Sequence, residues 1–338
     1  MKAYVLHAVN DLRYDDVQMP ECPEGWAIVQ VKAAGICSSD IARVFTKGTY
    51  HFPTIPGHEF SGVVAYVYGD KDSDWVGKRV GVFPLIPCKH CPQCEKKHYE
   101  MCAHYDYVGS RRDGGFAEYV AVPVWNLIAF PDCISFEEAA MLEPLSVALH
   151  AVKRGELKPE DDVAIVGTGM IGVAAGQWAK SFGAKSVTVI GRNEAKRQLI
   201  ENCGLQYVVC TDKKAMQEYD FVLEAVGFPA SVEMAVAGCK AGGTLLLMGN
   251  PSGDICLTQD MYWKILRKQL TMKGTWNSSY DGSNPSDWTE ATEALCSGGI
   301  QVKPLVSHTF AQSDLYEGLL LMKQHKEPYC KVMTLWNR

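Results

Sequence analysis

The sequence lacks the features expected of a membrane protein or a nucleic-acid-binding protein. The glycine-interrupted apolar stretch from Val163 to Gly176 is too short to span a bilayer. The N-terminus offers only a short apolar run before Asn10 and Asp11, without the longer apolar core and cleavage site of a signal peptide. Positive charge is not in excess, since 33 basic residues face 39 acidic ones and the formal net charge is −6. We therefore expect a cytoplasmic protein that has neither a membrane nor a nucleic acid as its partner.

Internal repeats and low-complexity tracts are also missing, which leaves an ordinary globular chain. Its 338 residues suffice for two domains and for no more than three, and 47% of them are apolar. What stands out is the thirteen cysteines. In a reducing cytosol, grouped cysteines indicate metal and scattered ones indicate core packing, and an odd count does not suit a pure disulfide framework. We expect eight scattered cysteines to be small packing residues: Cys22, Cys133, Cys203, Cys210, Cys239, Cys256, Cys296 and Cys330.

The hydrophobic pattern changes along the chain from β to alternating α/β. The N-terminal part contains short β-branched runs broken by turn residues, which is typical of an irregular β domain. Between 147 and 282, strand-like and helix-like segments alternate, as in a doubly wound parallel sheet of the Rossmann type. The residues that follow are too few for a domain of their own. We therefore predict an α/β protein with a β domain at 1–146, a Rossmann domain at 147–282 and a C-terminal return, 283–338, onto the first domain.

Four cysteines form a tight group within the predicted β domain. Cys88, Cys91, Cys94 and Cys102 have the spacing C-x2-C-x2-C-x7-C. Four thiolates this close along the chain can surround one tetrahedral ion and leave no open position for chemistry. An iron–sulfur cluster is an alternative, but no Pro follows Cys102 and no second cysteine group is present. Free thiols or disulfides are the other alternative. We predict a structural zinc ion in a lobe at 88–102.

A second group of potential metal ligands is spread along the chain. Cys37 and His58 lie twenty-one residues apart, with Glu59 directly after the histidine and Glu143 in an apolar segment where an unpaired carboxylate would be costly to bury. Asp40 could hold the imidazole ring of His58. A cysteine, a histidine and a glutamate with one open position make a catalytic zinc site. Singly, however, each residue also fits an ordinary core position, so the spacing alone leaves both interpretations open.

A glycine turn predicts a dinucleotide site. Gly167, Gly169 and Gly172 form G-x-G-x-x-G between a predicted strand and a predicted helix, and a second strand follows at the expected distance. The glycines permit the turn, the approach of pyrophosphate and close helix packing. The phosphates would then bind at the helix N-terminus, where Met170 and Ile171 lie.

The end of the next strand bears on the choice between NAD and NADP. NAD-selective sites usually carry an acidic residue there to bind the ribose 2′-hydroxyl. This chain has Gly191 and Arg192 instead, followed by Lys196 and Arg197, so room and positive charge are available for a 2′-phosphate. We therefore expect NADP rather than NAD. Glu194 lies nearby, and a solvated basic helix start is the alternative.

Taken together, these motifs resemble the zinc-dependent medium-chain dehydrogenases over essentially the whole chain. The segment GHEFSGVV, the four-cysteine lobe, the glutamate of MLEPLS and the later G-x-G-x-x-G occur in the family's order. The resemblance is to the polyol branch, and it implies a GroES-like catalytic domain before the Rossmann domain. It also implies that Cys37, His58 and Glu143 bind catalytic zinc, that Glu59 is an alternate ligand and that Ser39 begins a proton relay. Two zinc ions per chain and a homodimer or homotetramer are implied as well.

The same resemblance bears on the substrate. The segments YDYVGSRRDGGFAEY and ICSSDIARVF are similar to the branch that oxidises polyol phosphates such as galactitol 1-phosphate to ketose phosphates. Arg111 and Arg112 are then candidates to bind the phosphate, with Arg43 a weaker one. That branch is expected to use NAD, from which Gly191 and Arg192 depart. Threonine or another secondary alcohol is an alternative substrate, and a non-catalytic NADPH-binding zinc protein is an alternative of another class.

Overall fold

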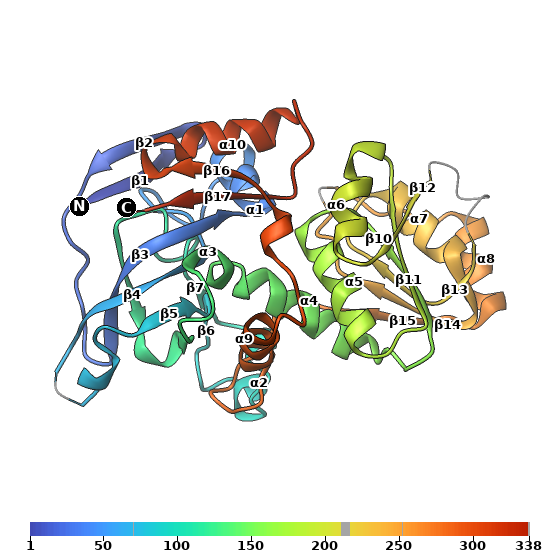
Figure 1. Cartoon of the computed structure of the whole chain (residues 1–338), viewed down its shortest axis with the longest axis horizontal. Coiled ribbons are helices and arrows are strands. Elements are labelled where there is room, and N and C mark those ends of the chain that lie inside the picture. Colours follow the sequence, from blue (N-terminus) through green and yellow to red (C-terminus); the bar gives the residue numbers. More distant parts are fainter. Residues whose placement is uncertain (70, 211–216, 252, 337–338) are drawn as a thin grey trace. The chain divides into compact units, whose positions relative to one another are not determined.

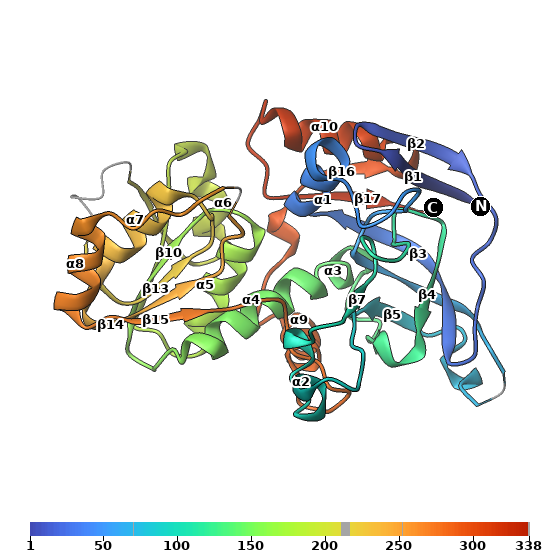
Figure 2. The same ribbon diagram turned by 180° about the vertical axis from the view of Figure 1, so that it is seen from behind.

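The computed structural model describes residues 1–69, 71–210, 217–251 and 253–336 (Figures 1 and 2). The chain divides into two compact units. Unit 1 comprises Met1–Glu143, Ser279–Gly298 and the chain from Val306 onward, and unit 2 comprises Pro144–Ser278 and Gly299–Leu305. The predicted C-terminal return is thus interrupted by a short piece of unit 2. None of the described helices is both long enough and apolar enough to cross a membrane.

Unit 1 is built on a seven-stranded sheet. Its strand order is β16-β17-β3-β4-β5-β9, with β8 also paired to β3. Strands β3 and β4 approach closely because Gly62 has no side chain, and a Cβ at Gly62 would lie 2.0 Å from the carbonyl oxygen of Gln30. The strands are β1 (Lys2–Ala8), β2 (Asp11–Asp16), β3 (Trp26–Ile36), β4 (Glu59–Val67), β5 (Arg79–Val82), β6 (Leu85–Ile86), β7 (Asp106–Tyr107), β8 (Tyr119–Pro123), β9 (Leu127–Ala129), β16 (Val306–Ala311) and β17 (Lys331–Leu335).

Helix α10 (Leu315–Gln324) packs against the returning C-terminal strands β16 and β17 (Figure 1). Strand β17 runs antiparallel to β3, with Val332 opposite Ile36. This pairing brings the end of the chain beside the residues that follow β3. The helices are α1 (Ser38–Ala42), a π-helical turn at Arg43–Lys47, α2 (Pro92–Glu95), α3 (Phe136–Ala139), α9 (Asp287–Ser297) and α10 (Leu315–Gln324).

Unit 2 is a parallel six-stranded sheet of the Rossmann type, as predicted. The strand order is β12-β11-β10-β13-β14-β15. From β10 the chain first adds β11 and β12 on one side and then β13, β14 and β15 on the other, which is the order of a dinucleotide-binding sheet. The strands are β10 (Asp162–Val166), β11 (Ser186–Gly191), β12 (Gln206–Val209), β13 (Tyr219–Glu224), β14 (Cys239–Leu247) and β15 (Thr271–Gly274). The helices are α4 (Leu142–Gly155), in which the boundary between the units falls, α5 (Met170–Ser181), α6 (Arg197–Asn202), α7 (Pro229–Gly238) and α8 (Gln259–Lys268).

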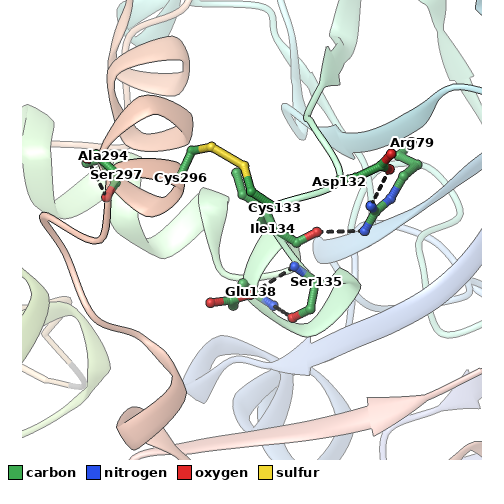
Figure 3. Close-up of a disulfide and its surroundings, with 9 residues drawn as sticks. All are labelled: Arg79, Asp132, Cys133, Ile134, Ser135, Glu138, Ala294, Cys296 and Ser297. Atoms are coloured by element: carbon green, nitrogen blue, oxygen red, sulfur yellow. Dashed lines mark hydrogen bonds and ion pairs between the residues drawn. A yellow bond between two sulfur atoms is a disulfide. The ribbon is translucent and has the colours of Figure 1, made fainter.

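Two of the scattered cysteines are bonded to each other. Cys133, just before α3, forms a disulfide with Cys296 on α9, and both residues are exposed (Figure 3). The prediction that they are packing residues is therefore wrong. The fold returns α9 to unit 1 and places the two Cα atoms 5.8 Å apart, which is within the range of a disulfide. Cys256 is also exposed and not a packing residue, whereas Cys203, Cys210, Cys239 and Cys330 are buried as expected.

We expect the disulfide to stabilise unit 1. A bridge across 163 residues restricts the unfolded chain, so the double variant Cys133→Ser/Cys296→Ser should lose about 2–4 kcal/mol of unfolding free energy in non-reducing buffer. In reducing buffer the variant and the wild type should unfold alike. Chemical denaturation measures both, with Cys256→Ser as the control for loss of an exposed thiol. An intact-protein mass without the loss of two hydrogens would contradict the bridge.

Candidate metal and cofactor sites

The four-cysteine lobe has the geometry of a closed metal site. The sulfur atoms of Cys88, Cys91, Cys94 and Cys102 lie within 4.8 Å of one another. The Sγ of Cys94 is 3.5 Å from that of Cys91 and 3.9 Å from that of Cys88. Tetrahedral coordination with zinc–sulfur bonds of about 2.3 Å requires sulfur atoms roughly 3.8 Å apart. The donor set therefore fits a zinc ion without rearrangement of the chain.

A second set of ligand atoms gathers where β3 ends and β4 begins. Cys37 follows β3 directly, and His58 with Glu59 opens β4. The ligand atoms of these three residues lie within 4.8 Å of one another, and His58 and Glu59 are buried. The predicted third ligand, Glu143 at the start of α4, is not part of this set. Glu143 is nevertheless buried nearby, since Tyr107 lies next to both Glu143 and His58: the Tyr107 hydroxyl is 3.4 Å from Glu143, and its ring centroid is 5.8 Å from that of His58.

The surrounding charges favour a divalent cation in this second set. With Cys37 as a thiolate, the form that binds metals, the site holds that charge and those of three buried carboxylates, Asp40, Glu59 and Glu143. Arg43 and Lys331 are its two cations. With His58 neutral and the carboxylates charged, as in a metal-bound site, two negative charges remain. Buried charge without compensation is costly, so a divalent ion suits both the donor atoms and the charge of the site.

The pKa values show how strongly these groups interact. Burial lowers the pKa of His58, but the negative charges of Asp40 and Cys37 outweigh that effect and raise it well above its usual value. Burial likewise opposes the charged form of Lys331, yet Glu59 and Cys37 raise its pKa overall. For Glu143, burial is the main cause that raises the pKa to about 7. The metal-free site therefore holds protons that a bound metal ion would displace from its ligands.

Lys331 is a member of this site that sequence reasoning missed. Its side chain is buried, pairs with the carboxylate of Glu59 and donates to the carbonyl oxygen of Ile36 at 3.3 Å. The pairing of β17 with β3 brings it there. A signal was present in the sequence, since a lysine stands among apolar residues in the last strand, but nothing in the sequence named its partner.

Asp40 connects three groups around the metal ligands. Its Oδ2 accepts the N–H of Cys37 at 3.0 Å, while Oδ1 lies 3.0 Å from Nη1 of Arg43 and 3.5 Å from Nδ1 of His58. The carboxylate is completely buried. It is therefore placed to orient the imidazole ring, as a carboxylate does beside a metal-bound histidine. Ser39, the predicted start of the relay, accepts a hydrogen bond from Nη1 of Arg43 at 2.8 Å.

The turn that carries the two predicted substrate arginines packs directly behind His58. A Cβ at Gly109 would lie 2.5 Å from the carbonyl oxygen of Gly57, and one at Gly114 would lie 2.1 Å from the same atom. Only glycine permits this contact. It places Tyr107 beside the site, where its ring centroid is 5.8 Å from that of His58 and its hydroxyl donates to Glu143 at 3.4 Å.

The two arginines of this turn have different surroundings. Arg112 forms an ion pair with Asp106 and lies over the ring of Trp26. Arg111 lies between the rings of Tyr50 and Tyr105, 4.1 Å and 4.5 Å from their centroids. Its buried Nε has no hydrogen-bond partner among the described residues. Arg111 is therefore the better placed of the two to bind an anion.

The dinucleotide turn has the predicted form. Gly167 adopts a φ of +132°, and a Cβ at Gly172 would lie 2.5 Å from the carbonyl oxygen of Gly167. Gly169 faces open space and is the N-cap of α5, which begins at Met170. The first N–H groups of α5, at Met170 and Ile171, have no helical partner and suit a phosphate group.

The residues after β11 are only partly available to a cofactor. Gly191 is required, since a Cβ there would lie 2.4 Å from Cγ2 of Thr168 and 2.5 Å from the hydroxyl of Tyr207. Arg197 is already paired with Glu194 and Glu201. Arg192 is exposed and forms no ion pair with any residue in the described part of the chain. Of the two predicted arginines, Arg192 is the one that a 2′-phosphate could recruit.

Comparison with known proteins is consistent with both units. Residues 23–132 match the model of the alcohol dehydrogenase GroES-like domain, and residues 171–297 match that of the zinc-binding dehydrogenases. Galactitol 1-phosphate 5-dehydrogenase from Escherichia coli is 36% identical over 329 residues, which cover 93% of this chain and 95% of that protein.

Solved structures resemble the whole chain as well. Galactitol-1-phosphate dehydrogenase from Escherichia coli has a TM-score of 0.90 at 33% identity, covering 99% of this chain and all of that one. An alcohol dehydrogenase from Escherichia coli in complex with NADH has a TM-score of 0.90 at 26% identity, covering 99% of both chains. A zinc-binding dehydrogenase from Sinorhizobium meliloti bound to NADP has a TM-score of 0.88 at 27% identity, covering 99% of this chain and 98% of that one.

Proposed function

This chain belongs to the zinc-binding dehydrogenases with an alcohol dehydrogenase GroES-like domain, and we propose that it oxidises a secondary alcohol of a polyol phosphate with NADP. The observation that carries the proposal is the set of Cys37, His58 and Glu59, whose ligand atoms lie within 4.8 Å of one another, with Ser39 two residues after the cysteine. Three protein ligands leave a fourth position for a substrate oxygen. A set closed by four cysteines, in contrast, supports only a structural role.

Each residue of the site has a distinct task in this reaction. Cys37 and His58 hold the metal with a glutamate, and Asp40 keeps the imidazole ring oriented. A zinc ion held by these residues would supply a Lewis acid that lowers the pKa of a substrate alcohol, and a bound nicotinamide would supply the hydride acceptor. Ser39 takes up the alcohol proton and passes a proton on toward solvent. The glycine turn before α5 binds the pyrophosphate and so orients the nicotinamide.

Glu143 is the glutamate that we propose as the third zinc ligand, with Glu59 as the alternate. Glu59 already has a cation, since Lys331 pairs with it. Within the described part of the chain, Glu143 accepts a single hydrogen bond, from Tyr107 at 3.4 Å. A buried carboxylate without a cation gains more from a metal ion than one that is already paired. Displacement of Lys331 from Glu59 would make the carboxylate of Glu59 available as the alternate zinc ligand.

A substrate and cofactor matrix tests the proposed function. Galactitol 1-phosphate, galactitol, sorbitol and L-threonine are each offered with NAD and with NADP, and the initial rate of nicotinamide reduction is measured. We expect the highest kcat/KM with galactitol 1-phosphate and NADP. The highest value with L-threonine would contradict the substrate class, and no turnover of any secondary alcohol would favour a non-catalytic NADPH-binding protein.

Arg111 is expected to recognise the phosphate of the substrate. The change Arg111→Ala removes a charged hydrogen-bond donor and should raise the KM for galactitol 1-phosphate by about 10- to 100-fold. The KM for galactitol should change by less than about threefold, since no phosphate is present. Arg112→Ala serves as the control, because Asp106 already pairs with Arg112. An equal change in both substrates would assign Arg111 a structural role.

Arg192 is expected to select NADP. Replacement by alanine removes the exposed guanidinium after β11 and should raise the KM for NADP about tenfold, with little change for NAD. Arg197→Ala is the matched control, because its guanidinium is held by Glu194 and Glu201. If wild-type protein already prefers NAD by a large factor, the assignment of Arg192 is wrong.

We also propose that the enzyme acts in the cytoplasm as a homodimer or homotetramer. The family resemblance supports the assembly, and Cys37 and the four-cysteine lobe, which bind metal only as reduced thiolates, suit a reducing compartment. Light scattering coupled to size exclusion measures the assembly. A monomer at micromolar concentration would contradict the proposed assembly. Cell fractionation tests the proposed cytoplasmic location.

A further inference from the structure

The side chain of Arg43 lies against residues of the candidate catalytic site and is not a free surface side chain. It ends helix α1, so Ser39 is four residues before it and Asp40 three residues before it, on the same face of the turn. Its Nη1 donates to Oγ of Ser39 at 2.8 Å and to Oδ1 of Asp40 at 3.0 Å. Its side chain is only 20% exposed. Nη1 also lies 3.5 Å from Nδ1 of His58, so the guanidinium is occupied by residues of the candidate catalytic site.

The direction of this hydrogen bond has a chemical consequence. An arginine side chain only donates, whereas a serine hydroxyl has one proton and two acceptor lone pairs. Because Oγ of Ser39 accepts from Arg43, the hydroxyl proton of Ser39 cannot point at Arg43. One lone pair remains to accept a proton from the substrate alcohol. The single hydroxyl proton of Ser39 is left to be donated onward.

We propose that Arg43 is a positioning residue that orients the hydroxyl of Ser39 for proton relay. This inference rests on the proposed function. During oxidation, the O–H bond of the alcohol breaks and a new O–H bond forms at Ser39, while the original Ser39 proton leaves to solvent. The C–H bond of the alcohol carbon breaks to give hydride, which is one proton with two electrons and would be accepted by NADP⁺ to give NADPH, so the alcohol loses two electrons and two protons in all. Arg43 keeps its own protons throughout and fixes the rotamer of Ser39.

Asp40 keeps Arg43 in place for this task. The carboxylate is completely buried, and its other oxygen accepts the N–H of Cys37 at 3.0 Å, so it cannot swing away without losing that bond. The same nitrogen, Nη1, is therefore held by Asp40 and donates to Ser39. This arrangement leaves Nη1 no role in binding a substrate phosphate.

The first test needs no substrate. Crystal structures of zinc-loaded wild type and of Arg43→Met are compared, together with zinc content and unfolding midpoint. We expect one Ser39 rotamer in the wild type, more than one in the variant, and about two zinc ions in both. Arg43→Lys replaces Arg43→Met if zinc is lost, because lysine keeps a positive charge beside Asp40. A single unchanged Ser39 rotamer in the variant would overturn the inference, even if the proposed function fails.

The second test is a double-mutant cycle with Ser39→Ala, using galactitol 1-phosphate and galactitol as substrates. Loss of Arg43 should lower kcat about 10- to 100-fold for both substrates in the wild-type background, as expected for impaired proton transfer. In the Ser39→Ala background it should change kcat less than about twofold, since the group it positions is gone. Guanidinium added to the buffer should restore part of the kcat of the single variant.

Equal losses of kcat in the wild-type and Ser39→Ala backgrounds would overturn the inference. So would a KM effect limited to galactitol 1-phosphate, which would make Arg43 a phosphate ligand. Wild-type inactivity would refute the proposed function instead.

Discussion

Replacing His58 with alanine is expected to reduce the zinc content from about two ions per chain to about one and to lower kcat by about 10³-fold or more. His58 is buried among Cys37, Glu59 and Asp40, and no other histidine is part of either metal-ligand set found in the described residues. The four-cysteine lobe does not depend on His58 and should keep its own ion. Zinc analysis of purified protein and steady-state kinetics measure the two effects.

The matched control for this change is His7→Ala. His7 lies on β1, is partly exposed and pairs with Asp15 at the surface. It should retain about two zinc ions and wild-type kcat. A His58→Ala variant with two zinc ions and unchanged turnover would show that Cys37, His58 and the glutamates do not form the catalytic site. The reaction would then have to take place at another site of the chain.

Replacing Lys331 with methionine is expected to cost about 3–5 kcal/mol of unfolding free energy. The change leaves the carboxylate of Glu59 buried without its cation, and an uncompensated buried charge is strongly destabilising. Chemical denaturation of the zinc-loaded protein measures the cost. Lys331→Arg keeps the charge and should lose much less.

A second substitution separates the charge from the packing. In the double variant Lys331→Met/Glu59→Gln the buried negative charge is gone, so most of the lost stability should return. If Lys331→Met lowers the unfolding free energy by less than about 1 kcal/mol, another cation must neutralise Glu59. Binding of zinc by Glu59 in place of Glu143 would then be the better explanation. Zinc content measured on the same variants distinguishes these cases.

Features that depend on neighbours in the chain were predictable from the sequence. Four cysteines within fifteen residues can reach one ion whatever the rest of the fold does. The glycine turn between β10 and α5 likewise follows from local backbone geometry, because Gly167 and Gly172 are required where they occur. The alternation of strands and helices was sufficient to predict the Rossmann sheet of unit 2.

Features that join distant segments were not predictable in the same way. Glu59 and Lys331 are 272 residues apart, and Cys133 and Cys296 are separated by 163. Cysteine spacing and the expected compartment both argued against a disulfide, and that expectation was wrong. The residues next to Lys331 or Cys296 in the sequence do not indicate which distant segment packs against it.

By itself, then, the sequence determined the four-cysteine cluster, the glycine turn before α5 and the family of the protein. Each is a local pattern whose residues meet through short-range geometry. The tertiary structure decided which acidic and basic groups surround Cys37 and His58, which of two adjacent arginines is free to bind an anion, and that Arg43 holds Ser39. Those outcomes depend on the return of β17 to β3 and on the packing of the 107–115 turn against Gly57, since burial and charge pairing are set only when remote segments come together.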